Sequence, residues 1–154
     1  MRKPDLDRIE RELQVHLPKA YRDTLETYPF PVDDHSVGMW LVDDADDVIS
    51  STHSWRDAQP NSLPWPATLV YIGSDGGEYA YFLDVSRDPA PVMVYDHETG
   101  TVLGEEAPNL PSFVEKCRRD LEEIEADKRA MKARFRNKKW WEFWIRPYPS
   151  RDAT

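Results

Sequence analysis

Four aspartates within five residues could bind a hard cation or attract a basic partner: Asp43, Asp44, Asp46 and Asp47. A calcium loop needs alternating oxygen ligands, a glycine at its sixth position and a distal glutamate, and this segment lacks that pattern. The main interpretation is a solvated helix start, whose acidic first turn meets the positive end of the helix dipole. The second interpretation is an acidic partner surface shared with Asp33 and Asp34.

The other residue types with catalytic or metal-binding chemistry form no motif. The four histidines are scattered, without the spacing of a zinc site: His16, His35, His53 and His97. Cys117 falls on the apolar stripe of a predicted helix, which favours burial over a nucleophilic role. Ser74 lies in Gly-Ser-Asp-Gly-Gly (73–77), which is not the Gly-x-Ser-x-Gly elbow of a hydrolase. We therefore predict no catalytic residue, no metal and no cofactor, and a protein that is not an enzyme.

The C-terminal segment combines aromatic rings with cations. Its three tryptophans are Trp140, Trp141 and Trp144. The segment could anchor at a membrane interface, bind a partner, or fold back onto the rest of the chain. Residues 1–110 hold 8 Lys+Arg and 21 Asp+Glu, whereas residues 111–154 hold 12 and 8. Because anionic lipid would repel the acidic part, we rank docking or partner binding above a membrane role.

Three further tryptophans lie in or beside predicted strands and loops: Trp40, Trp55 and Trp65. Core packing is the main interpretation for each, with burial worth about 2–3 kcal/mol apiece. Trp55 and Trp65 border a proline-rich loop (59–66), the least regular part of the chain. Either side chain could instead line a binding groove.

Apolar spacing and prolines predict the elements of the first half. A helix ends near Pro18, because the residue before a proline avoids helical angles. Pro18 then opens a second helix, which Pro29 stops. The predicted buried stripes of these two helices are Leu6, Ile9 and Leu13, and Tyr21, Leu25 and Tyr28. Residues 38–42 predict a strand, and the aspartate cluster begins a helix that runs to about Ala58.

The glycine-rich segment 71–84 predicts a β-hairpin, with strands 68–72 and 79–83. A second strand follows these glycines, so no helix N-terminus is present there to hold a phosphate. Strands are also expected at 91–95 and 101–103. Residues 112–115 have the spacing of a capping box and should open the longest helix. It reaches about residue 137 with an apolar stripe at Cys117, Leu121, Ile124, Met131 and Phe135, interrupted by Lys128.

The order of these features resembles the SUKH superfamily, which groups Smi/Knr-type cell-wall regulators with bacterial toxin-immunity proteins. The resemblance rests on the helix, Leu-Pro, helix order of 9–25, the hairpin of 70–84, and the strand of 92–97 followed by the helix start at 112–116. It covers roughly residues 6–125. It implies an α+β fold, a mostly antiparallel central sheet with N-terminal helices and a long C-terminal helix packed on it. It implies no catalytic residues and a protein-binding role, in many bacterial members neutralisation of a cognate toxin.

We therefore expect a SUKH-like domain at 1–137 and an aromatic tail at 138–154. The expected function is an immunity protein that masks the active surface of a basic toxin domain, for example a nuclease. The alternative is a regulatory scaffold for a cellular or cell-wall-related enzyme. Nucleic acid is not an expected partner. Homodimerisation through the C-terminal helix or tail is a further expectation.

The chain has no apolar run resembling a signal peptide, no apolar stretch near the roughly 20 residues of a membrane span, and a single cysteine. These features predict a cytoplasmic protein. The residues expected to bind the partner are Asp33, Asp34, Asp43, Asp44, Asp46, Asp47, Trp55, Trp65, Trp140, Trp141 and Trp144.

Overall fold

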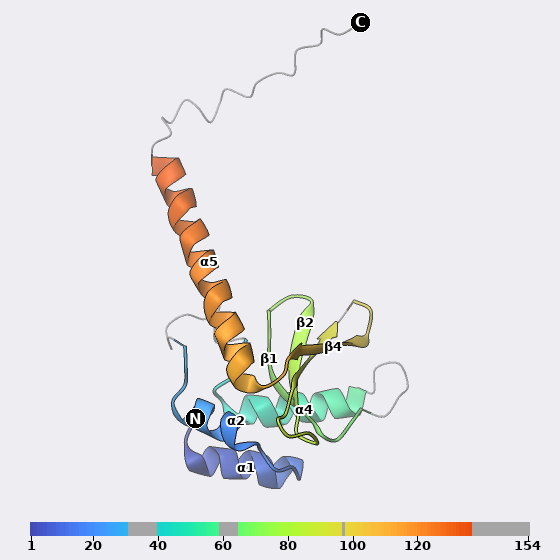
Figure 1. Ribbon diagram of the computed structural model, residues 1–154. Coiled ribbons are helices and arrows are strands. Elements are labelled where there is room, and N and C mark those ends of the chain that lie inside the picture. The colour runs from blue at the N-terminus through green and yellow to red at the C-terminus, as the bar shows by residue number, and fades with distance from the viewer. Residues whose placement is uncertain (31–39, 59–64, 97, 137–154) are drawn as a thin grey trace, which may run out of the picture. The chain divides into compact units, whose positions relative to one another are not determined.

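The computed structural model describes residues 1–30, 40–58, 65–96 and 98–136 (Figure 1). The chain forms two compact units, Met1–Arg118 and Arg119–Thr154. The first unit contains three helices and a four-stranded antiparallel sheet within its described residues, followed by the start of a fourth helix. The predicted α+β fold is confirmed. The predicted boundary between a domain and a tail at residues 137 and 138 stays a prediction.

The first two helices are α1 (Lys3–Leu13) and α2 (Lys19–Glu26), close to their predicted bounds. Gln14 ends α1 in a left-handed conformation with φ 55°, and Pro18 is the N-cap of α2. The Glu10 carboxylate joins the two helices, because it accepts a hydrogen bond from Leu17 N at 2.7 Å and pairs with Arg22 Nη1 at 2.9 Å. The predicted stripes are buried in the core, except for the half-buried Tyr28: Leu6, Ile9, Leu13, Tyr21 and Leu25.

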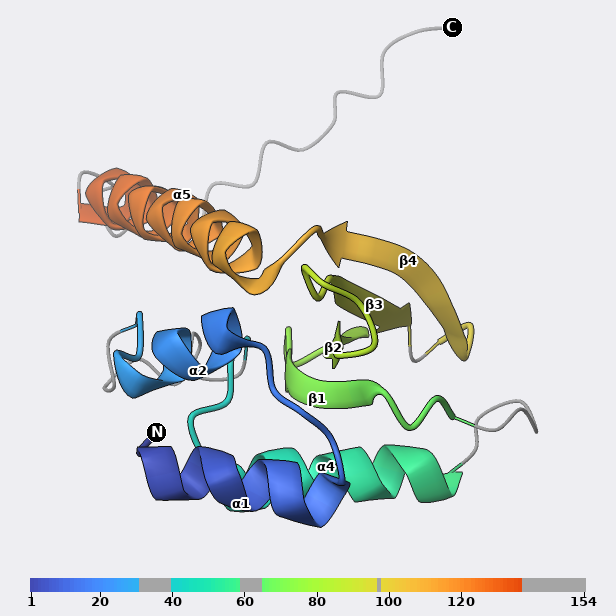
Figure 2. The ribbon, with the colours of Figure 1, turned by 60° about the horizontal axis from the view of Figure 1, so that its bottom comes forward.

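The sheet is a simple meander in the order β1 (Leu69–Ser74), β2 (Tyr79–Asp84), β3 (Val92–Asp96) and β4 (Thr101–Ala107) (Figure 2). The predicted hairpin is β1 and β2. Its turn is fixed by the Asp75 carboxylate, which accepts hydrogen bonds from Gly77 N at 2.8 Å and Tyr79 N at 3.0 Å. Gly76 has a φ of 76°, which side chains resist. The glycine-rich segment therefore serves as a structural turn.

Helix α4 (Ala45–Ala58) packs against both α1 and β1 (Figure 2). Thr52, the buried polar side chain of the described core, makes the connection to the sheet. Its hydroxyl donates to Val48 O at 2.7 Å within α4 and accepts from Tyr71 N of β1 at 3.0 Å. A second polar connection comes from Arg56, which donates to Ala67 O at 2.5 Å just before β1. The orientation of α4 on β1 is thus set by hydrogen bonds as well as by apolar packing.

The predicted strand at 38–42 is wrong for its described part. Residues 40–42 form a turn and a loop, and Gly38 and Met39 lie outside the described residues. A single backbone bond, from Val42 N to Ile72 O at 2.7 Å, connects this segment to β1. The chain turns into the start of α4 before a ladder can form, so apolar β-prone residues here did not make a strand.

The predicted capping box at 112–115 is also wrong. Helix α5 (Leu110–Arg136) begins two residues earlier, and Asn109 caps it. The Asn109 side chain accepts a hydrogen bond from Ser112 N at 2.9 Å, and its carbonyl accepts from Phe113 N at 3.1 Å. Asparagine is among the strongest N-caps, and Pro111 is tolerated in a first helical turn. Ser112 therefore lies inside the helix rather than at its cap.

Replacing Thr52 by valine should lower the free energy of unfolding by about 1–3 kcal/mol, because the partly buried Tyr71 N–H would lose its acceptor. Urea denaturation would measure this. The matched control is Thr24→Val, since the Thr24 hydroxyl makes the same bond to the carbonyl four residues back, Ala20 O at 2.7 Å. That change should stay within about 0.5 kcal/mol. Equal losses for the two variants would show that the connection to β1 contributes nothing.

Candidate partner-binding site

Three of the four clustered aspartates share one hollow of about 460 Å³, here named the acidic hollow. It lies where the start of α4 meets β1. Asp47 and Ser51 come from one face of α4 at i,i+4 spacing, and Tyr71 and Ser74 come from β1. Its lining residues are Val42, Asp43, Asp44, Asp47, Ser51, Tyr71 and Ser74.

The three carboxylates of the acidic hollow differ in how they are held. Asp43 contacts the Met1 α-ammonium, which also donates to Leu25 O at 2.7 Å. Asp44 caps α4 by accepting a hydrogen bond from Asp47 N at 3.0 Å. Among the described residues, neither Asp44 nor Asp47 forms an ion pair with a cation. Two negative charges of the hollow are therefore left without a cationic partner there.

Asp46 belongs to the same sequence cluster but does not line the acidic hollow. Its carboxylate pairs with Arg8 Nη2 of α1 at 2.7 Å, and its side chain is 83% exposed. Successive helical residues point about 100° apart, so Asp46 and Asp47 face different neighbours. The structure thus brings three members of the predicted acidic surface together and places Asp46 outside the hollow. Asp33 and Asp34 lie outside the described residues.

The negative charges of the acidic hollow contribute to raising the pKa of two nearby tyrosines, Tyr28 and Tyr71. Burial, followed by the charge of Asp43, raises the pKa of Tyr28 to about 12, and its hydroxyl donates to Leu41 O at 2.5 Å. Burial also raises the pKa of Tyr71, with a further contribution from Asp47 that opposes the effect of its hydrogen bond to Ser74. A site with this field favours a cation, such as the ammonium or guanidinium group of a protein side chain.

A metal ion is a poorer match for the same chemistry. Within the described ranges, no group of three or more His, Cys, Asp or Glu side chains is arranged to hold a metal. In the acidic hollow itself, one of the three carboxylates is used by Met1 and another by the helix cap. The arrangement of carboxylates in the acidic hollow is therefore better suited to attracting a cationic protein surface than to holding a metal ion.

Trp55 and Trp65 pack together in an aromatic cluster and do not line the acidic hollow. Their ring centroids lie 5.5 Å apart, and both rings contact Phe82 of β2 and Tyr95 of β3 at 4.8–5.4 Å. Both side chains are half-buried against the core residues Leu69, Phe82 and Tyr95. Core packing was the main interpretation of these tryptophans, and their groove role stays a prediction. Trp140, Trp141 and Trp144 lie outside the described residues.

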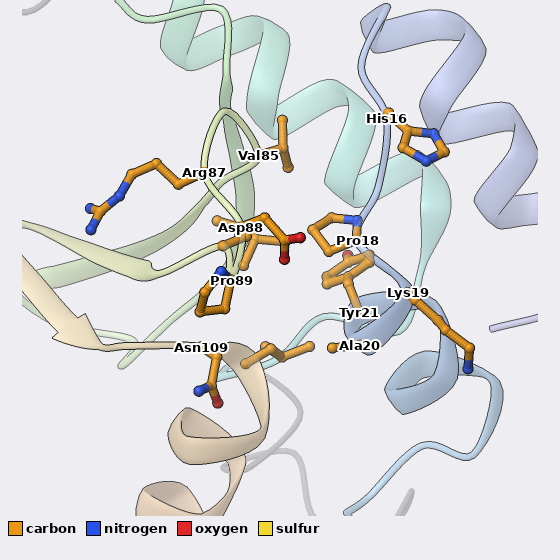
Figure 3. Close-up of a pocket in the computed structure, with 13 residues that line it drawn as sticks. His16, Pro18, Lys19, Ala20, Tyr21, Val85, Arg87, Asp88, Pro89 and Asn109 are labelled. Carbon is orange, nitrogen blue, oxygen red and sulfur yellow. The ribbon is translucent and has the colours of Figure 1, made fainter.

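A second hollow of about 390 Å³ was not predicted from the sequence, because three segments far apart in the chain build it (Figure 3). They are residues 16–21 at the start of α2, residues 83–90 at and after the end of β2, and residues 109–110 at the start of α5. Its floor is largely apolar, including Tyr21 and Leu110. Figure 3 shows Lys19 and Arg87 pointing away from each other, so these two cations do not converge on one point of the hollow.

These features define an α+β domain with an acidic surface hollow. The chain matches the model of the SMI1 / KNR4 family (SUKH-1) over residues 3–116, and it belongs to that family. Neither a curated protein nor a solved structure matches it. The family match ends within the first two turns of α5, so the rest of that helix lies beyond it. Among the described helices, none has the length and apolar character needed to cross a bilayer.

The Tyr28→Phe variant should have a lower free energy of unfolding than the parent chain near neutral pH, and this difference should shrink as the pH rises. Because the pKa of Tyr28 is about 12 in the folded chain and 10.0 ordinarily, its protonated phenol stabilises the fold fully below pH 10 and progressively less toward pH 12. The variant also lacks the hydrogen bond to Leu41 O. Urea denaturation from pH 8 to 11.5 should therefore show the largest difference from the parent at pH 8. A constant difference across this range would contradict the assignment.

Proposed function

We propose that this chain is a non-catalytic protein-binding domain and, more narrowly, a bacterial cytoplasmic immunity protein that neutralises a cognate toxin. The observation that carries this proposal is the acidic hollow, with Asp44 and Asp47 left without cationic partners among the described residues. Family membership agrees with an immunity or regulatory role. The substrate of the toxin is not specified by these observations.

The mechanism would be steric and electrostatic. A nuclease toxin, as one example, must present lysines and arginines to bind a phosphate backbone. An acidic surface on the immunity protein would meet those same cations and cover the cleft. Complementary charge raises the rate of association and suppresses wrong partners more than it sets the final affinity. Apolar neighbours of the hollow such as Val42 would then exclude water from the contact.

The alternative function is a regulatory scaffold that binds a cellular or cell-wall-related enzyme. The observation that favours it is the extension beyond the family match, residues 117–154, which holds several cations and the aromatic tail. Such an extension could attach the domain to a second protein. Formation of a 1:1 complex that abolishes a toxic activity separates the two functions.

Affinity capture from lysate of the source organism, using the full chain as bait, tests the proposal. Immunity predicts retention of a basic toxic domain through a low-salt wash and loss of its activity in a purified 1:1 mixture. Retention of a housekeeping or envelope enzyme, without any toxic domain, would contradict immunity and support the scaffold.

Once a partner has been identified, the double variant Asp44→Asn, Asp47→Asn should bind it roughly tenfold more slowly at low salt. The rate of association should also depend less on salt concentration. Asparagine remains a good N-cap, so the start of α4 should be kept. The control is Glu78→Gln, Glu98→Gln, which removes the same charge at exposed positions outside the hollow. Stopped-flow or surface-based kinetics would measure both. Equal slowing by the two pairs would show a general charge effect and no specific role for the hollow.

A further inference from the structure

The second unit carries apolar side chains that α5 leaves open to solvent. Leu121 is half-buried, Ile124 is 39% exposed and Met131 is 60% exposed. With Lys128 they recur at alternating spacings of three and four residues, which places them on one face of the helix. This is the a/d pattern of a helix that pairs with another helix, with one polar residue at an a position. We name the row formed by Leu121, Ile124, Lys128 and Met131 the apolar seam. Its exposed apolar side chains would be stabilised by packing against another surface.

The charges along the same helix are divided into two halves. Residues 119–127 contain five acidic residues and one arginine, whereas residues 128–136 contain five basic residues and no acidic one. A parallel pair of identical helices would place like charges side by side. An antiparallel pair places each acidic half beside a basic half. The charge pattern therefore selects both the occupant, a second copy, and its direction.

The residues flanking the apolar seam are divided in the same way, with acidic side chains in the first half and basic side chains in the second. Glu125 and Asp127 flank it in the acidic half, and Lys132 and Arg134 flank it in the basic half. In an antiparallel pair centred between residues 129 and 130, each flank of the seam faces the same flank of the second copy. Glu125 therefore lies beside Lys132 of the second copy, and Asp127 lies beside Arg134 of the second copy. Charges at these flanking positions are known to set partner choice and orientation in paired helices.

We propose that α5 pairs in antiparallel fashion with the same helix of a second chain over residues 124–135. Lys128 then lies level with Met131 of the second copy, where its aliphatic stem can cover the thioether. The Lys128 ammonium stays at the edge of the seam, where it pairs with Glu125 of its own chain at 3.1 Å. The seam is about two heptads long, so the dimer is weak and depends on protein concentration. This proposal is independent of the proposed function, because it uses only the second unit.

Sedimentation equilibrium of the full chain tests the dimer. We expect the mass to rise from 18.0 kDa toward twice that value with increasing concentration. Ile124→Asp should raise the dissociation constant at least tenfold. The control Ala126→Asp adds the same charge to the opposite face of the helix and should change it less than threefold. A monomer at every concentration, or equal effects of the two variants, would overturn the proposal.

Charge exchange tests the choice of partner. The variant Glu125→Lys, Asp127→Lys and the variant Lys132→Glu, Arg134→Glu should each lose self-association. A 1:1 mixture of the two should regain a dimer, because every flanking pair is then of opposite charge. Failure of the mixture to associate would overturn the charge argument.

Direction is measured by distances between spin labels attached at Arg119→Cys in a Cys117→Ser background. The antiparallel pair separates the two labels by about 30 Å along the axis, from the rise of 1.5 Å per residue. Labels closer than about 20 Å would show a parallel pair and overturn the proposed direction.

Discussion

The hydroxyl of Thr52 joins the two elements from which the acidic hollow is built. It accepts the Tyr71 amide hydrogen of β1 while donating to Val48 O inside α4. Asp47 and Ser51 lie within a turn or so of Thr52, and Ser74 lies three residues beyond Tyr71. A shift of α4 along β1 would therefore break the bond from Tyr71 N to the Thr52 hydroxyl and separate the two walls of the hollow. Because a partly buried amide without an acceptor is costly, the arrangement is held in one register.

Cations of the described residues pair with only some of the four aspartates clustered at the start of α4. Asp43 contacts the Met1 α-ammonium and Asp46 pairs with Arg8, so these carboxylates help to hold α4 on its neighbours. Asp44 and Asp47 instead benefit from the positive end of the helix dipole. A helix start thus tolerates two carboxylates for which the described part of the chain offers no cationic partner. The same arrangement leaves a negative field available to a cationic partner, which links a local rule of helix capping to the proposed function.

The sequence predicted secondary structure best where short-range signals, such as prolines and apolar spacing, agree with the packing of the folded chain. Proline positions and apolar spacing located α1 and α2, and the glycine-rich turn located β1 and β2, because each signal acts within a few residues. The segment at 38–42 has strand-like composition, but its described residues 40–42 form a turn and a loop just before α4, and one backbone bond joins them to β1. At α5, two residues have cap-forming side chains, and Asn109, the stronger local cap, begins the helix before the Ser112 motif is reached.

The candidate site was predictable only in part, for a physical reason. Asp43, Asp44 and Asp47 are visible as a cluster in the sequence, whereas Tyr71 and Ser74 reach them only through the packing of α4 on β1. The direction of Asp46 follows from helical geometry once the helix start is fixed. The second hollow combines segments far apart in the sequence, and no local pattern marks it. Sites made by tertiary contact therefore needed the structure.

Hydrogen–deuterium exchange of the full chain, with and without the partner retained by affinity capture, tests the central claim most directly. That claim is that the acidic hollow, held by the contact of α4 with β1, is the binding surface. The account predicts that the partner slows amide exchange in residues 42–51 and 71–74. Slowed exchange confined to other segments, such as 83–90 around the second hollow, would contradict it.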